Sequence, residues 1–97
     1  MRQKAKVDVN QPEIVKALRK IGAGVLITSQ LKKAFDILVF YRYNTYVMEI
    51  KDGELPPSGK KLTTGEQECR EMIESHGCKY HIVESIEEAF KILGVGE

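Results

Sequence analysis

The sequence lacks the patterns that mark several large classes of protein. Its 97 residues include only two cysteines, Cys69 and Cys78, and their spacing is not that of a metal or redox motif. We therefore interpret them as reduced thiols of a cytoplasmic protein. No apolar run approaches the roughly 18 residues of a membrane span, and no signal peptide opens the chain. These absences predict a cytoplasmic protein without a membrane partner.

Patterns of common catalytic sites are also missing. The two histidines, His76 and His81, form no metal-ligand spacing with the cysteines, and no Ser–His–Asp or Cys–His arrangement can be argued. The short glycine segments are not placed as a phosphate-binding loop would be. The sequence shows no internal repeat, and its 42% hydrophobic and 30% charged residues are ordinary for a globular protein. We expect one domain over residues 1–97, with a modest core that a partner chain would often support.

The charges are unevenly distributed along the chain. Residues 1–35 carry eight Lys or Arg against two acids, a net charge of +6, and residues 36–97 carry seven against twelve, a net charge of −5. A basic segment joined to an acidic remainder fits an anionic partner that meets one face. A solvated helix followed by a solubilising tail explains the same charges, and charge alone favours that explanation.

Periodicity and turn residues predict the order helix, three strands, helix, strand, helix. Asn10 and Glu13 have the spacing of a helix cap, with Pro12 in the first turn. Runs rich in β-branched and aromatic residues predict strands within 24–29, 35–42, 44–51 and 79–83. Thr63 or Thr64 would cap the second helix, and Ser85 with Glu88 the third. The expected fold class is α/β, with a mixed four-stranded sheet flanked by helices (α-β-β-β-α-β-α).

The predicted hairpin, whose turn lies around residues 42–44, brings three charged residues together at its open end. Glu49 and Lys51 share a strand face because side chains alternate, and Asp36 lies thirteen residues before Glu49. Asp36 falls opposite Glu49 or opposite Lys51, depending on the turn, and both registers place all three on one face. Two carboxylates so close repel unless a cation joins them, and oxygen ligands suit Mg²⁺. A solvated cross-strand salt bridge is an equally good explanation of the triplet alone.

The motifs "FDILVFYR", "YVMEIKDG", "LTTGEQE" and "KYHIVESIEEAFKILG" resemble the PD-(D/E)xK nuclease superfamily, in particular its small, phage-type VRR-NUC branch. The resemblance covers nearly the whole chain and implies a restriction-endonuclease-like core. It further implies a Mg²⁺- or Mn²⁺-dependent endonuclease that hydrolyses phosphodiester bonds in DNA. Small members of the branch act as homodimers and are associated with branched DNA such as four-way (Holliday) junctions.

Site roles follow from the same resemblance, residue by residue. Asp36 and Glu49 would hold the metal together with the main-chain carbonyl of Ile50, and Lys51 would serve the attacking water. Gln67 takes the place of the family's glutamine on the following helix, although it could equally cap that helix with Thr64. The resemblance also implies that Glu13 is an acid that helps at the metal site. The main alternative is that Glu13 caps the first helix.

The expected contacts to DNA come from basic residues near the motif. These are Lys32 and Lys33 before the Asp36 strand, Lys60 and Lys61 in the long loop, and Arg42 at the hairpin tip. Each could instead be a solvated side chain, and the tip aromatics could stack on bases, pack against a second subunit or be half-buried strand residues. Phe35 departs from the proline that usually precedes the aspartate. It gives the only hint of the alternative function, a DNA-binding module of the same fold with weak or lost catalysis.

Overall fold

The computed structural model describes residues 8–96, and its elements follow the predicted order. Within the described residues, none of the helices has the length and apolar character needed to cross a membrane. A short 3-10 helix inside the long loop was not predicted. The elements are α1 (Gln11–Lys20), β1 (Gly24–Ile27), β2 (Ile37–Tyr41), β3 (Asn44–Ile50), η1 (Pro57–Lys60), α2 (Thr64–Ser75), β4 (Tyr80–Val83) and α3 (Ile86–Leu93).

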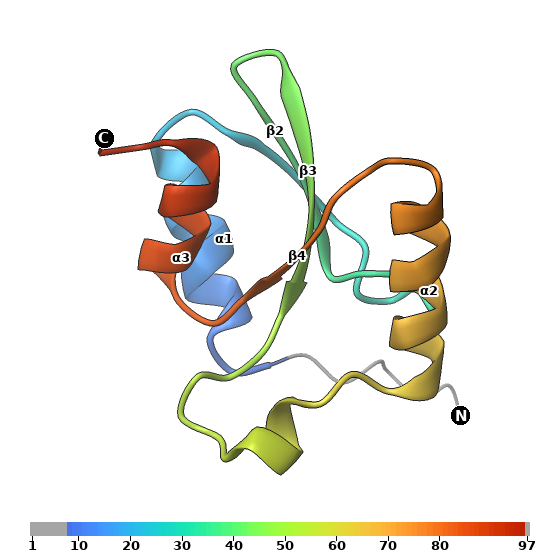
Figure 1. Ribbon diagram of the computed structural model, residues 1–97. Coiled ribbons are helices and arrows are strands. Elements are labelled where there is room, and N and C mark those ends of the chain that lie inside the picture. Colours follow the sequence, from blue (N-terminus) through green and yellow to red (C-terminus); the bar gives the residue numbers. More distant parts are fainter. Residues whose placement is uncertain (1–7, 97) are drawn as a thin grey trace.

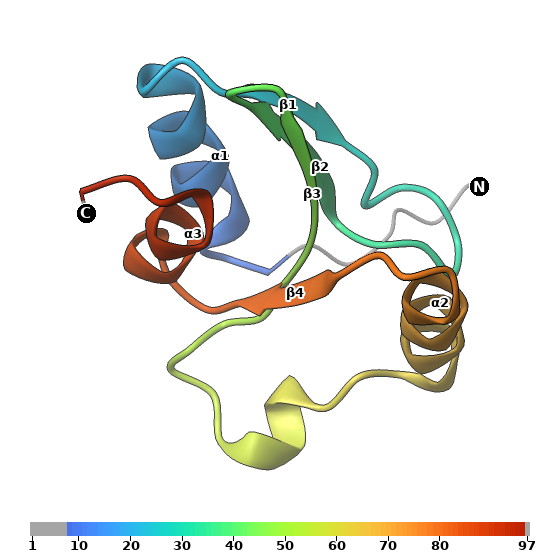
Figure 2. The same cartoon turned by 45° about the horizontal axis from the view of Figure 1, so that its top comes forward.

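The strands form one four-stranded sheet in the order β1-β2-β3-β4. β1, β2 and β3 pair antiparallel through short connections, and β4 returns parallel to β3 after the α2 crossover. α1 and α3 lie together on one face of the sheet, and α2 lies on the other (Figures 1 and 2). The mixed α/β architecture predicted from the sequence is therefore confirmed.

Two apolar clusters hold the layers together. The larger one joins α1 and α3 to the sheet through fully buried residues such as Ile14, Leu18, Met48 and Ile50. The smaller one packs α2 on the opposite face and centres on buried Cys69, Ile73 and Tyr80, with Phe35 packed against it. α2 therefore covers only part of its face, and Leu26 and Phe40 on the strands farther from it are 55% and 45% exposed.

The hairpin between β2 and β3 has the first of the two expected registers. Tyr41 pairs with Asn44, so the turn consists of Arg42 and Tyr43, and the last pair at the other end is Ile37 with Met48. Asp36 thus lies beside Glu49. Because side chains alternate along a strand, Glu49 projects toward the α2 face while Met48 and Ile50 enter the larger core.

One of the expected helix caps, that of α1, differs in the structure, and one of the two candidates for α2 is selected. Asn10 makes no side-chain cap for α1, and its amide instead donates to the carbonyls of Lys51 and Glu84, both at 3.1 Å. Thr63, not Thr64, caps α2 in a capping box with Glu66. Ser85 caps α3 as predicted by accepting from the Glu88 amide.

Candidate functional site

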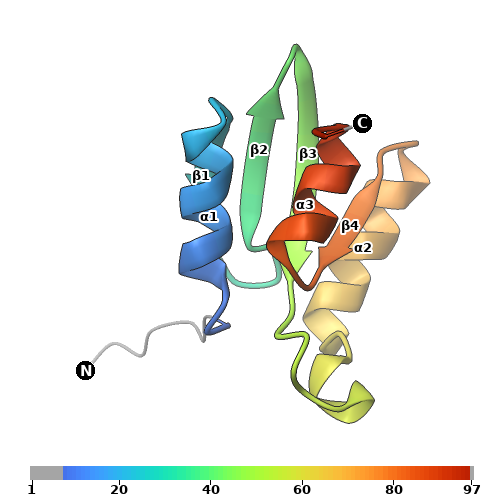
Figure 3. The same ribbon diagram turned by 90° about the vertical axis from the view of Figure 1, so that its left-hand side faces the viewer.

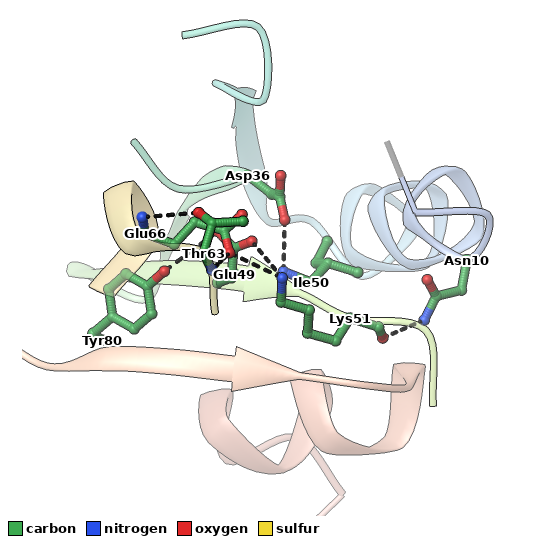
Figure 4. A network of polar contacts seen from close by, with 8 residues as sticks. All are labelled: Asn10, Asp36, Glu49, Ile50, Lys51, Thr63, Glu66 and Tyr80. Atoms are coloured by element: carbon green, nitrogen blue, oxygen red, sulfur yellow. Dashed lines mark hydrogen bonds and ion pairs between the residues drawn. The ribbon is translucent and has the colours of Figure 1, made fainter. Parts of the chain in front are cut away.

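Asp36, Glu49 and Lys51 come together where the β2–β3 hairpin opens, beside the first turn of α2 (Figure 4). Asp36 directly precedes β2, Glu49 is the second-last residue of β3, and Lys51 directly follows it. Glu49 and Lys51 are only 2% and 8% exposed. Charged residues are rarely so buried unless they are paired or bind an ion, so the solvated surface pair considered above does not describe this site.

Asp36 takes the place of a strand residue at the end of the hairpin. Its Oδ2 accepts a hydrogen bond from the amide of Ile50 at 2.8 Å, and its own amide donates to the carbonyl of Met48 at 3.2 Å. Burial raises the pKa of Asp36 above its ordinary value, although the Ile50 amide opposes this effect. The backbone thus fixes the carboxylate next to Glu49 at the cost of desolvating it.

Glu49 is the most perturbed carboxyl group of the site. Burial, followed by the negative charge of Asp36, raises the pKa of Glu49 to about 9. The hydroxyl of Tyr80 donates to Glu49 Oε1 at 3.3 Å, and Lys51 Nζ lies 3.6 Å from Oε2. One lysine shared with another acid does not compensate two adjacent carboxylates, of which Glu49 is buried and Asp36 half-buried. A proton or a further cation is needed to do so.

Lys51 is held by both its main chain and its ammonium group. Its amide donates to the carbonyl of Val83 at 2.9 Å, and its carbonyl accepts from Asn10. Its Nζ donates to Glu66 Oε1 at 3.0 Å. Burial lowers the pKa of Lys51, but the hydrogen bond and charge of Glu66 outweigh burial and raise that pKa overall. Lys51 is therefore a fixed, charged donor in the site.

Glu66, Tyr80 and Asp8 belong to the site but were not predicted. Glu66 accepts from Lys51 while it also accepts from the Thr63 amide at 2.9 Å, so one carboxylate caps α2 and holds the lysine. These two interactions lower the pKa of Glu66 in spite of its burial. The Thr63-x-x-Glu66 spacing was a detectable signal for Glu66. No comparable signal existed for Asp8 or Tyr80, which tertiary folding brings to the site.

A cleft of about 500 Å³ opens beside the three residues. Five carboxylates and two lysines line its described part, which leaves a clear excess of negative charge. They are Asp8, Asp36, Glu49, Asp52 and Glu66 with Lys51 and Lys61. A second hollow of about 410 Å³ shares Asp36, Glu49 and Glu66 with this cleft, and Lys32 and Lys33 are among its other lining residues.

The structure does not bring all predicted site residues to this cleft. Gln67 lies on the exposed side of α2, where its amide donates to Glu71 at 3.1 Å, and Glu66 is the α2 residue that meets Lys51. Glu13 is exposed in the first turn of α1, outside the residues that line either hollow. The geometry therefore gives no support to the expected roles of Gln67 and Glu13.

The predicted DNA-binding residues have different surroundings. Lys61 lines the cleft, whereas Lys60 pairs with Glu84 at 3.3 Å. Lys33 lies 4.0 Å from Glu68 of α2. Arg42 lies at the opposite end of the hairpin from Glu49, so it is no part of this cleft.

Phe35, the departure from the expected proline, has a structural role. Its ring packs against the cluster under α2, and its carbonyl accepts a hydrogen bond from the Thr28 hydroxyl at 2.6 Å. The Thr28 amide donates to the Asp36 carbonyl at 2.8 Å. Phe35 thus anchors the backbone that positions Asp36 by packing, without the fixed backbone of proline.

The donor set fits a hard divalent cation. Within residues 8–96, no three His, Cys, Asp or Glu side chains are already grouped as metal ligands. Asp36 and Glu49 nevertheless offer two adjacent carboxylates, and the main-chain carbonyl of Ile50 directly follows Glu49 in sequence. Mg²⁺ commonly binds through one or two carboxylates and keeps several waters. The raised pKa values of both acids are the electrostatic sign that a positive charge would be stabilised here.

Fold and site together define an α/β domain with an Asp–Glu–Lys centre in which the glutamate and the lysine are buried. A solved structure described as "VRR_NUC domain" matches with a TM-score of 0.63 and 19% identity, over 91% of this chain and 98% of that one. No family model and no curated protein matches the sequence. The chain therefore has the fold of a VRR_NUC domain, with a restriction-endonuclease-like core, as the sequence resemblance implied.

Proposed function

We propose that the protein is a divalent-metal-dependent endonuclease that hydrolyses phosphodiester bonds in DNA. The observation that carries the proposal is the convergence of half-buried Asp36 with buried Glu49 and Lys51 at an acidic cleft in a VRR_NUC fold. A buried arrangement with more carboxylates than cations is destabilising in itself. Such an arrangement is expected where function requires it.

Asp36, Glu49 and the Ile50 carbonyl would hold the metal, Mg²⁺ or Mn²⁺. When bound, it would supply Lewis-acid activation of a water and neutralise charge on the phosphate. Lys51 donates its hydrogen bond to Glu66, which holds it charged 3.6 Å from Glu49 Oε2, and from there it would stabilise negative charge on the attacked phosphate. Tyr80 orients Glu49 through its hydroxyl. Lys32, Lys33 and Lys61 line the adjoining hollows, where they would contact the DNA backbone.

We further propose that the substrate is branched DNA, such as a four-way junction, and that the protein acts as a homodimer. One chain presents one centre, and two centres related by a twofold axis can cut two strands. The outer edge of β1 has no strand partner among the described residues, and Leu26 and Phe40 on the adjacent sheet face are about half exposed. An edge strand can pair antiparallel with its own copy about a twofold axis, which makes this edge the candidate interface.

A cleavage assay tests the catalytic proposal. Labelled linear, flapped and four-way DNA are incubated with Mg²⁺, Mn²⁺ or EDTA and with wild type, Asp36→Asn or the matched control Asp52→Asn, another acid of the cleft. Cutting of branched DNA should require metal and be lost in Asp36→Asn only. Cutting that persists in EDTA and in Asp36→Asn contradicts the proposal. Tight DNA binding without cutting under any metal favours the alternative, a DNA-binding module with this fold.

Light scattering tests the dimer, with Leu26→Lys as the disruptive variant and Leu31→Lys as a control at an exposed position outside the sheet. The wild type and Leu31→Lys should have the mass of two chains. A charge at Leu26 should reduce the mass to that of one chain. A monomeric wild type at assay concentrations contradicts the dimer proposal but leaves the metal centre unaffected.

A further inference from the structure

The β2–β3 hairpin ends in a two-residue turn with an unusual composition. Tyr41 pairs with Asn44, so Arg42 and Tyr43 form the turn, with φ values of 48° and 69°. Both residues are in the left-handed region, as in a type I′ turn, where Asn-Gly is the usual choice because side chains strain this backbone. Two large side chains at these positions weaken the hairpin, and strain of this kind is typically retained where function needs the side chains.

The side chains of this turn are displayed outside the folded body. The hairpin tip projects past the ends of α1 and α3 (Figures 1 and 3). Tyr43 is fully exposed. The Arg42 guanidinium lies over the ring of Tyr41, 5.0 Å from its centroid, which orients the cation at the tip. Both residues of the turn are exposed, so burial in the core of the domain explains neither of them.

The charge and composition of the hairpin indicate the class of partner. Residues 37–48 contain no acid, and Arg42 is their only charged residue. An exposed aromatic ring beside an oriented arginine provides a stacking surface and a phosphate donor, which are the two groups that bind an unpaired nucleotide. An acidic peptide would use the arginine but has no comparable need for the flat ring of Tyr43.

We propose that the hairpin tip is a second DNA-binding site, at which Tyr43 stacks on an unstacked base and Arg42 binds a neighbouring phosphate. The site rests on the proposed function, because it names the DNA feature that directs the same catalytic centre. From Asn44 to Glu49, β3 extends about 17 Å, which corresponds to roughly five base steps of DNA. The tip thus contacts DNA at a distance from the bond that is cut.

This site explains a preference for branched DNA in physical terms. In a continuous duplex both faces of each base are covered by its neighbours, so Tyr43 finds no surface on which to stack. At a junction or flap the stack is interrupted, and a base face is accessible. Stacking on an aromatic side chain strengthens binding by roughly 5- to 100-fold per base, so Tyr43 adds affinity only where the duplex is broken, whereas the phosphate contact of Arg42 is available on any DNA.

Single substitutions separate the two contacts. Binding of labelled four-way DNA and of a matched duplex is measured by fluorescence anisotropy in EDTA, so that no cutting occurs. Tyr43→Ala should weaken junction binding by roughly 5- to 100-fold and leave duplex binding within about twofold, whereas the matched variant Tyr43→Phe keeps both. Arg42→Ala should weaken both substrates and reduce the slope of log affinity against log salt by about one.

A double substitution separates binding from folding. Arg42→Asn with Tyr43→Gly installs the residues that the turn prefers, so the melting temperature should rise by a few degrees. The same variant should lose junction affinity at least as strongly as Tyr43→Ala. A contact that merely supports the fold would be lost together with stability, whereas here stability and binding change in opposite directions.

The outcomes distinguish this site from the nuclease proposal. If the double variant binds junctions as tightly as wild type, the tip site is wrong and the nuclease proposal stands. If junction binding depends on Tyr43 but no metal supports cutting, the tip site stands and the nuclease proposal fails. Loss of the dimer in the double variant, measured by light scattering, would show that the tip contacts a second chain and would overturn the DNA assignment.

Discussion

Glu49→Gln should stabilise the metal-free protein at neutral pH, although it removes a residue of the proposed centre. In the folded state, burial and the charge of Asp36 raise the pKa of Glu49 to about 9, against an ordinary value of 4.5. When folding raises the pKa of a carboxyl group, the folded protein loses stability as pH rises from the pKa of the unfolded state to that of the folded state. Glutamine keeps the shape of the protonated acid and does not ionise.

The magnitude follows from proton linkage. Between pH 5.5 and pH 7.5 the unfolded chain has released this proton and the native chain keeps it, so stability falls by about 1.4 kcal/mol per pH unit for one proton. Two pH units give about 2.7 kcal/mol. Because Asp36 and Glu49 titrate as a pair, we expect the loss of unfolding free energy to lie between roughly half of this value and the full value. For a domain of this size that is a difference in melting temperature of about 5–20 °C.

Differential scanning calorimetry or thermal circular dichroism in EDTA, from pH 5.5 to pH 8, measures the effect. The melting temperature of wild type should fall more steeply with pH than that of Glu49→Gln, and the exposed control Glu54→Gln should follow wild type. Added Mg²⁺ at ten times its dissociation constant should restore about 1.4 kcal/mol to wild type and little to Glu49→Gln. Parallel pH curves for wild type and Glu49→Gln would refute the buried, repelling carboxylate pair.

Three further predictions test the contacts around the centre. Lys51→Met leaves the carboxylates of the centre without their cation, so it should abolish cleavage. In chemical denaturation it should lower the unfolding free energy by up to about 3 kcal/mol at pH 8 and by less at pH 5.5. Asn10→Ala removes two hydrogen bonds that fasten the chain after β3, and should cost about 2 kcal/mol in the same assay, with Asn44→Ala as an exposed control. Glu66→Ala should reduce the cleavage rate about 10-fold or more, because Lys51 loses its partner. Gln67→Ala, on the outer side of α2, should retain near wild-type cleavage. The reverse ranking of the two variants in single-turnover kinetics would contradict the structure.

The position of the α2 residues shows where prediction from sequence ended. Glu66 and Gln67 are adjacent, and one step along a helix turns a side chain by about 100°. The residue that meets Lys51 therefore depends on where α2 begins and how the helix is rotated on the sheet. Thr63 caps the helix, and the path of the loop from Asp52 to Leu62 brings its first turn to the hairpin. The Thr63-x-x-Glu66 spacing is a local signal for the start of the helix, but the rotation of α2 on the sheet and the path of the loop do not follow from local spacing.

By itself, the sequence determined the order of the elements and the common face of Asp36, Glu49 and Lys51. Both depend on local rules: apolar periodicity and turn residues for the elements, and the alternation of side chains for the shared face in either register.

Tertiary structure alone decided the register, the burial of Glu49 and Lys51 and the partners that complete the site. Asp8, Glu66 and Tyr80 reach the centre from three separate segments, and Arg42 is carried to the far end of the hairpin. The physical reason is that burial and pKa depend on how much protein surrounds a carboxylate in three dimensions, which only the packing of α2 and β4 against β3 establishes.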